Sequence, residues 1–463
     1  MASHASTVLD GRPVTQALFN KIQIPKPVHP ANLMVLFWAF ICLVYFFGPI
    51  YLTPAASIST FLFVSLHLLM FIVGSTILSR VVFFKTLNNQ QPYLSYITNK
   101  SLYTIISFVL CIGLIGAISS IYSKLAILGD LSFSSISRLR ELRAQGLLHG
   151  GSMQSTVLSA LAFLAYPAGF VGLVATIICY ETIPRLSRIL CFLFVISIIL
   201  LAVCVGGRSP IMVLFLFIGA SCYVRNKMGK SYTPRSLPLR MAIASLVILF
   251  FAYSSFIWVL RSTESGMSAS SMVAHAENVW GAHPKEYLVK TSEWLNDPGF
   301  TQTILSTTFY FIQSLSISER LLSSSEVTPT MYGAYQIDLF AAFFRVIPGG
   351  ADFLKNAYGI LLDDNVYGFF TGAWAGLFID FGVFSFLAAL LWGYFAGKSW
   401  VNFKRNPGVL TGVPYVFWTY SIFISFVSFP FGFSNSFMIF IWFLFFSLAS
   451  MLCYRYRCVT KIS

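Results

Sequence analysis

Charged residues are scarce in this sequence. Asp, Glu, Lys and Arg make up 10% of its 463 residues, whereas hydrophobic residues make up 57%. A soluble globular domain carries about 25% charged residues, so the composition excludes that class. The apolar residues form unbroken runs long enough for helices to cross a ~30 Å hydrocarbon core, not the ~10-residue alternating segments of a membrane β-barrel. We therefore expect an all-α polytopic integral membrane protein.

Patterns typical of disulfides, metal sites and secretion signals are also missing. The eight cysteines all fall inside apolar runs or close to the last one, which argues against a disulfide framework and a cysteine-ligated metal. No HExxH or DxD motif occurs, and the adjacent carboxylates of Asp363 and Asp364 would diverge on a helix. The first thirty residues lack the basic and apolar regions of a signal peptide, so the first span should be an uncleaved anchor. We expect no metal and no cofactor.

Ten apolar runs divide the chain into four parts. The runs cover residues 33–52, 57–78, 102–122, 157–180, 189–205, 210–224, 241–260, 374–396, 410–427 and 437–452. The parts are an N-terminal segment (1–32), a bundle of seven transmembrane helices (33–260), a large loop (261–371), and three transmembrane helices with a short tail (372–463).

The large loop contains two further apolar stretches, 303–317 and 339–347. If both crossed the membrane, the bundle would have twelve spans instead of ten. We favour helices that lie at or partly within the outer surface of the membrane.

The net charge of +14 is distributed by side of the membrane. If successive loops alternate, the side of the N-terminus holds 19 of the 30 Lys and Arg residues and only two of the 16 Asp and Glu residues. Cytoplasmic loops carry such an excess of basic residues, so both termini are predicted to be cytoplasmic and loop 261–371 to face outward. The basic balance is thus a topology signal, and no nucleic-acid partner is expected.

Ionisable residues inside the apolar runs are few. For His67 we favour a histidine whose hydrogen bonds are satisfied within the bundle over a proton relay. Asp380 lies in the first third of its run, and a carboxylate at that depth is costly unless it has a partner.

Arginines collect on the outer side. Guanidinium groups match phosphate oxygens with paired donors, so this set favours a pyrophosphate held just above the bilayer. The alternatives are a solvated amphipathic helix around Arg140 and a tight turn in which Arg208 snorkels to lipid headgroups. The predicted pyrophosphate-binding residues are Arg208, Arg261, Arg140, Arg345 and Arg143.

The chain resembles the Wzy-type oligosaccharide repeat-unit polymerases of bacterial surface-polysaccharide synthesis. The resemblance is carried by the turn at residues 206–209 (GGRS), by the large outward loop before the last spans, and by residues 365–382 (NVYGFFTGAWAGLFIDFG), similar to the family's segment ending in Asp-Phe-Gly. Some members have an Arg-x10-Gly pattern, which Arg140 and Gly151 fit, whereas Arg261, Arg320 and Arg345 do not.

This resemblance implies a metal-independent enzyme of the bacterial inner membrane with the layout of a C-type glycosyltransferase. A growing glycan on undecaprenyl pyrophosphate would be transferred to the non-reducing end of a newly flipped lipid-linked unit, at the periplasmic face. The product would be an O-antigen or a capsule-like polymer. The arginines would clamp the pyrophosphate, and His283, His275 and Glu264 are candidates for the general base by location alone.

The expected partners are the undecaprenyl-pyrophosphate-linked glycan, as donor and acceptor, and membrane lipid. A chain-length-regulating copolymerase and a flippase are possible protein partners.

Two other functions stay open. A ligase that moves the finished polymer to another acceptor would need the same pyrophosphate clamp. A flippase or other transporter of lipid-linked glycan would place polar groups near the bilayer midplane, often on broken helices. The apolar runs are nearly uncharged and the arginines lie at one face, so transport is the less favoured alternative.

Overall fold

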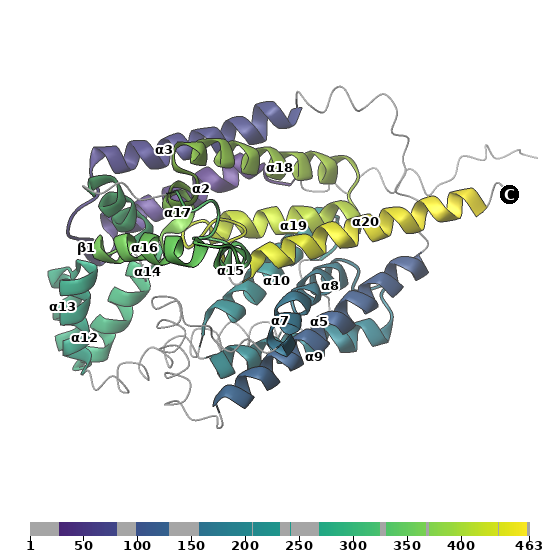
Figure 1. Cartoon of the computed structure of the whole chain (residues 1–463), viewed down its shortest axis with the longest axis horizontal. Helices are drawn as coiled ribbons and strands as arrows, with labels where there is room; N and C mark the ends of the chain where they lie inside the picture. Colours follow the sequence, from purple (N-terminus) through teal and green to yellow (C-terminus); the bar gives the residue numbers. More distant parts are fainter. Residues whose placement is uncertain are drawn as a thin grey trace, which may run out of the picture.

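Figure 1 shows a computed structural model that describes residues 27–80, 99–128, 157–205, 207–231, 241, 268–324, 330–366, 370–433 and 435–460. The first part contains α2 (Pro30–Phe47), α3 (Ile58–Val73) with a following π-helical turn (Gly74–Leu78), α5 (Asn99–Leu128), α7 (Val157–Ala165), α8 (Ala168–Ile178), α9 (Arg185–Val205) and α10 (Ser209–Lys227). The second contains α12 (Ala269–His275) with a π-helical turn (Ala276–Trp280), α13 (Glu286–Leu295), α14 (Pro298–Ser323), α15 (Asp338–Val346), α16 (Gly350–Asp363), α17 (Gly372–Phe381), a 3-10 turn (Gly382–Phe384), α18 (Ser385–Arg405), α19 (Val409–Ile424) and α20 (Ser436–Thr460). The strands are β1 (Ile50–Leu52) and β2 (Ala282–Pro284).

The chain is an all-α membrane protein. Among the described residues, seven helical stretches are long and apolar enough to cross a membrane, and two shorter apolar helices, α19 and the first part of α20, accompany them. The run 210–224, the shortest of those predicted, belongs to α10, which is 19 residues long because it starts at Ser209-Pro210 and continues to Lys227. Proline suits this first turn, since no helical partner exists there for its missing N–H. The predicted span 241–260 lies outside the described residues, apart from Met241.

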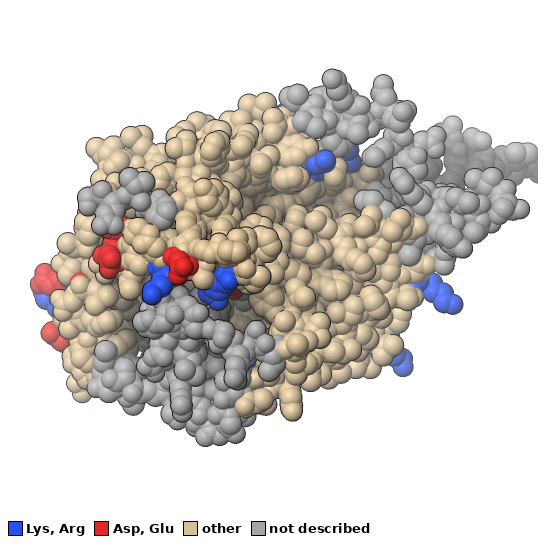
Figure 2. Space-filling model, viewed as in Figure 1, with Lys and Arg blue, Asp and Glu red and all other residues tan. Residues whose placement is uncertain are grey.

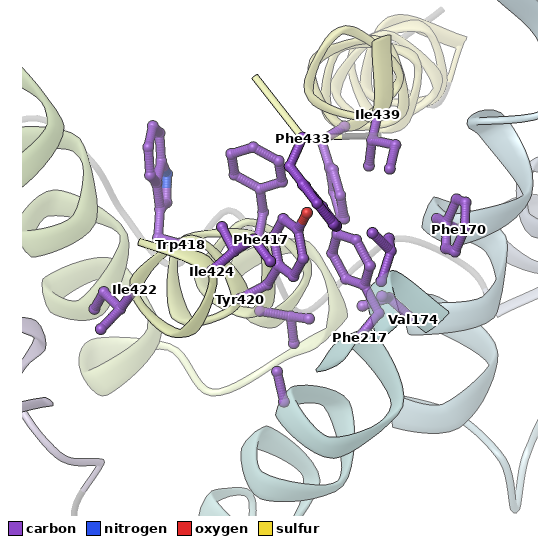
Figure 3. Packing of buried hydrophobic residues seen from close by; sticks show 14 of the residues in the cluster. Phe170, Val174, Phe217, Phe417, Trp418, Tyr420, Ile422, Ile424, Phe433 and Ile439 are labelled. Atoms are coloured by element: carbon purple, nitrogen blue, oxygen red, sulfur yellow. The ribbon is translucent and has the colours of Figure 1, made fainter. Parts of the chain in front are cut away.

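The described spans form two groups that meet at α19. α5 packs on α7, α8 and α9, while α3 packs on α18 along their length, and α10 and α8 join the groups through α19. Aromatic residues fill the joint, where the rings of Phe217 and Tyr420 stack with centroids 4.3 Å apart beside Phe417, Phe170 and Phe433 (Figure 3). Offset stacking of this kind adds to the stability gained from burial.

Helices approach closely where glycine faces a neighbouring backbone. A Cβ added at Gly393 of α18 would lie 2.0 Å from the carbonyl oxygen of Phe71 in α3, and one added at Gly397 would lie 2.3 Å from that of Ser75. Small residues at such positions let helix backbones touch, which is how membrane helices gain van der Waals contact.

One end of the molecule carries a two-stranded ribbon. β1, between α2 and α3, pairs antiparallel with β2, so that Tyr51 lies opposite His283. α12, α13 and α14 pack beside this ribbon (Figure 1), and we call this the ribbon end. On the face in Figure 2, acidic side chains gather at the end where α12 and α13 lie, and the charged side chains visible at the opposite end are basic. On this face, acidic side chains therefore lie toward the ribbon end, together with some basic ones.

α14 joins the ribbon to the bundle. It is a single 26-residue helix that packs on α2, α3 and α17. Glu319, near its C-terminal end, accepts hydrogen bonds from the backbone N–H and hydroxyl of Ser57, directly before α3 (2.7 and 2.6 Å). The apolar stretch 303–317 is thus part of one longer helix at the ribbon end, and 339–347 corresponds to α15.

The run 374–396, expected as one span, is broken. Gly382 has φ 54° and ψ −132°, a conformation that a helix does not contain and that glycine adopts without a steric penalty. Phe378 of α17 lies next to Phe63 of α3, and Trp374 lies next to His67, one turn further along α3 (both pairs with ring centroids 5.5 Å apart). α17 therefore runs antiparallel to α3, toward the ribbon end, and α18 turns back beside it as a hairpin.

Candidate functional site

Arg208 lies at the ribbon end of α9 and α10. The amide of Gly207 donates to the Ala202 carbonyl, which closes the last turn of α9, and Arg208 then occupies the N-cap position of α10. Its guanidinium lies 5.5 Å from the centroid of the Tyr310 ring in α14. A guanidinium over an aromatic face is attracted by the ring quadrupole, so this contact orients a half-buried cation.

Tyr310 is itself fixed by neighbours from three directions. Its ring meets Phe370 and Phe426 edge-on, at centroid distances of 5.1 and 6.0 Å. Gln313, one turn along α14, donates from Nε2 to the Tyr310 carbonyl (3.1 Å) and accepts from the Phe370 amide (3.4 Å). These contacts hold the ring beneath Arg208 in place.

Phe370 and Phe426 adjoin a junction where two helices end inside the bundle. The amides of Gly372 and Ala373, which begin α17, donate to the carbonyls of Val427 and Ser425, just beyond α19 (3.2 and 2.8 Å). Trp38, in the middle of α2, donates to the Ser425 hydroxyl (3.0 Å), so this junction lies about midway along α2. Because these two N-terminal amides of α17 bond to carbonyls, they cannot bind an anion.

Asp380 organises the backbone near this junction. Its carboxylate is fully buried and accepts hydrogen bonds from the amides of Tyr335 and Gln336 (2.8 and 3.0 Å). The turn at residues 331–337 is thereby attached to α17. The partner that a buried carboxylate requires is thus provided by backbone N–H groups.

His67 is satisfied within the bundle, in keeping with the favoured interpretation. Nδ1 lies 2.9 Å from the carbonyl oxygen of Phe63, and Nε2 lies 3.0 Å from the hydroxyl of Ser385. The carbonyl requires a proton on Nδ1, so Nε2 accepts from Ser385, and both ring nitrogens of a neutral imidazole are occupied.

The other predicted site residues that the structure describes lie on separate elements. His283 lies in β2, with its ring stacked on Tyr51 at 5.0 Å, and His275 ends α12 with its ring 6.0 Å from that of Trp280. Arg345 is exposed in the last turn of α15. Arg140, Arg143, Arg261 and Glu264 lie outside the described residues.

Trp280 and Arg208 contact neighbouring residues of α14. Trp280, the neighbour of His275, stacks on Phe309 with ring centroids 5.1 Å apart, whereas Arg208 lies over Tyr310. Consecutive residues of a helix point about 100° apart. Arg208 and Trp280, the neighbour of His275, therefore contact different sides of α14.

Two adjacent residues of α14 have structural roles that the sequence does not indicate. Arg320 donates to the carbonyls of Trp280 and Asn365 (both 3.0 Å), and so connects α14 with the turn after α12 and the turn after α16. Glu319 caps the start of α3. Burial raises the pKa of Glu319, but hydrogen bonds from Ser57 and Thr60 outweigh this and leave the pKa below its usual value. Only the folded chain brings these partners together.

Within the described residues, no three His, Cys, Asp or Glu side chains lie close enough together to hold a metal ion. No protein-family model, curated protein or solved structure matches the chain. The argument for function therefore rests on the residues themselves.

Proposed function

We propose that this protein is a glycosyltransferase that joins undecaprenyl-pyrophosphate-linked repeat units into a surface polysaccharide at the periplasmic face of the bacterial inner membrane. The ribbon end would face the periplasm. The observation that carries the proposal is Arg208, a half-buried guanidinium oriented by Tyr310 at the predicted outer side of a membrane bundle. The motif resemblance to Wzy-type polymerases gives the substrate class.

The reaction balances as a displacement at a sugar carbon. The acceptor hydroxyl oxygen forms a bond to the anomeric carbon while the bond from that carbon to the pyrophosphate breaks. The hydroxyl proton passes to a base, and undecaprenyl pyrophosphate leaves with the electron pair. Arg208, with Arg140, Arg143, Arg261 and Arg345 as further candidates, would stabilise the charge that grows on the leaving oxygen.

The candidates for the general base are His283, His275 and Glu264, by location alone. His283 is half-buried beside an exposed Tyr51 on the ribbon, so a substrate above this end could reach it. Base function requires hydrogen-bond reach to the acceptor hydroxyl, and this geometry can tighten when substrate binds.

The test uses purified protein in nanodiscs with an undecaprenyl-pyrophosphate-linked repeat unit and no added metal. Products are separated on a gel that resolves single repeats. Wild-type protein should give a ladder of lengthening lipid-linked glycan. Arg208→Ala should reduce the rate by about 100-fold or more, because removing one donor to a developing oxyanion has an effect of that order. Arg208→Lys should retain part of the wild-type rate, because lysine offers a positive charge without paired donors.

Lys290→Ala is the matched control. Lys290 is another cation at the ribbon end, exposed on α13 and paired with Glu286 (Nζ to Oε1, 2.6 Å). This variant should retain the wild-type ladder. Full activity in Arg208→Ala, Arg261→Ala and Arg345→Ala alike would refute the pyrophosphate clamp.

A transporter of lipid-linked glycan is the second candidate, and one observation favours it. The junction of α17 and α19 places helix ends about midway along the bundle, an arrangement that many transporters use for substrate sites. In reconstituted vesicles, movement of the lipid-linked unit between leaflets without a ladder would establish this function and exclude polymerisation. A ligase would transfer the finished glycan to a different acceptor and likewise give no ladder.

A further inference from the structure

The glycine face of α17 packs against polar side chains. Gly372 and Gly376 are four residues apart and so lie on one face of this helix. A Cβ at Gly372 would lie 2.5 Å from the Cβ of Ser314, and one at Gly376 would lie 1.4 Å from Nε2 of Gln336 and 3.0 Å from Oγ1 of Thr371. Glycine is therefore needed at both positions to admit these side chains. Ser314, Gln336, Thr371 and Ser428 form what we call the polar seam.

Two donors in the polar seam have no hydrogen-bond partner among the described residues. Ser428 donates to Oε1 of Gln336 (2.6 Å), which fixes the orientation of that amide. Nε2 of the same amide and the hydroxyl of Ser314 have no hydrogen-bond partner among the described residues. Both residues are buried, with Gln336 6% and Ser314 2% exposed. Among the described residues, ten buried side-chain atoms lack a partner, and these two are distinguished by their place on the glycine face of α17. Because buried polar groups are usually satisfied, we take these two donors as a place for a further group.

The position of the seam agrees with a ligand site. Its residues surround the junction where α17 begins and α19 ends, about midway along α2. Non-helical backbone at such depth occurs where it is enclosed by protein or lines a polar cavity. The seam also adjoins Phe370, whose ring contacts Tyr310 beneath Arg208.

The chemistry of the seam selects a neutral ligand. Its side chains are hydroxyls and one carboxamide, and the nearby Asp380 carboxylate is bonded to the amides of Tyr335 and Gln336. We propose that the polar seam binds a hydroxyl-bearing sugar ring, with Nε2 of Gln336 and the hydroxyl of Ser314 as donors. The identity of the sugar, as the unit attached to the pyrophosphate, rests on the proposed function.

Ser314→Ala tests the proposal with little risk to folding, because it removes a hydroxyl that bonds to nothing in the described structure. Two probes are titrated into protein in nanodiscs: the free oligosaccharide released from the lipid-linked repeat unit by mild acid, and undecaprenyl pyrophosphate without sugar. Affinity for the oligosaccharide should fall about 3- to 10-fold, the range for one hydrogen bond. Affinity for undecaprenyl pyrophosphate should stay unchanged.

Ser318→Ala is the matched control. It lies one turn along α14, equally buried, but its hydroxyl donates to the Ser314 carbonyl (2.7 Å). This variant should bind both probes as wild type does. Gln336→Leu provides a second test, with its melting temperature measured in parallel, and should weaken oligosaccharide binding at least as much as Ser314→Ala.

The outcomes distinguish failure of the sugar-binding proposal from failure of the proposed polymerase function. Wild-type affinity for the oligosaccharide in both Ser314→Ala and Gln336→Leu would overturn the inference and leave a seam that holds only water. No binding of the free oligosaccharide by the wild type would overturn it as well. Selective loss in these variants, in a protein that makes no ladder, would uphold the sugar site and reject the polymerase.

Discussion

At the scale of single residues, the charged side chains on and beside α14 differ in what they contact. Glu319 and Arg320 are occupied with hydrogen bonds to the starts and ends of other elements. Arg208 instead lies over the ring of Tyr310, at the start of α10. This position, at the predicted outer end of two spans, makes Arg208 the functional candidate.

Glu319 should make stability depend on pH. Its pKa in the folded chain is below the usual value, so its contribution is present above the unfolded pKa of about 4.3 and is lost as the pH falls through the folded value. Glu319→Gln should therefore lower the melting temperature most near neutral pH, and this difference should shrink below about pH 4. Glu286→Gln, an exposed carboxylate on α13, should have little effect at any pH. An equal loss for Glu319→Gln at pH 4 and pH 7 would contradict the capping role.

At the scale of elements, the sequence predicts the helices better than their directions. Apolar runs mark the membrane-crossing helices because burial in lipid requires apolar residues throughout. Hydropathy does not show where the chain changes direction within an apolar run, so the hairpin of α17 and α18 was not predicted. Its cause is a glycine with positive φ at position 382, in a sequence that contains 31 glycines. The hydrogen bonds that join α17 to the end of α19 also link distant segments, and no local pattern encodes them.

Packing of α3 on α18 gives a prediction for this scale. Gly393→Ala would put a Cβ within 2.0 Å of the Phe71 carbonyl oxygen, and the helices would have to separate. We expect a loss of about 1–3 kcal/mol, as for other overpacked cores. Gly219→Ala in α10 is the control, since nothing lies within 4 Å of its added Cβ. Gly219→Ala should raise the free energy of unfolding by about 0.5–1 kcal/mol, because alanine favours a helix more than glycine does. Thermal unfolding in detergent measures both, and equal effects would contradict the close approach.

At the scale of the whole molecule, the distribution of charge between the loops predicts how the protein lies in the membrane. Lys290→Cys on α13 should react with a membrane-impermeant thiol reagent from outside the inner membrane, because the ribbon end is predicted to be periplasmic. Asn406→Cys, exposed after α18, should react only once the membrane is permeabilised. The parent protein, with its native cysteines, sets the background. The opposite pattern would place the ribbon end, and Arg208 with it, in the cytoplasm.

The sequence also predicted the candidate site only in part. Arg208 could be singled out because it follows two glycines at the end of an apolar run. Its platform could not, because Tyr310, Phe370 and Phe426 come from three segments that only the folded chain brings together. The unpaired donors of the polar seam were equally hidden, since serine and glutamine occur throughout the chain.

The junction between α17 and α19 also bears on how the chain is made. The first amides of α17 bond to carbonyls of Ser425 and Val427, which are synthesised roughly 3 to 11 seconds later at typical elongation rates. During that interval α17 has polar backbone without its final partners, and lipid cannot supply substitutes. Until α19 has been synthesised, we therefore expect water to bond these two amides of α17.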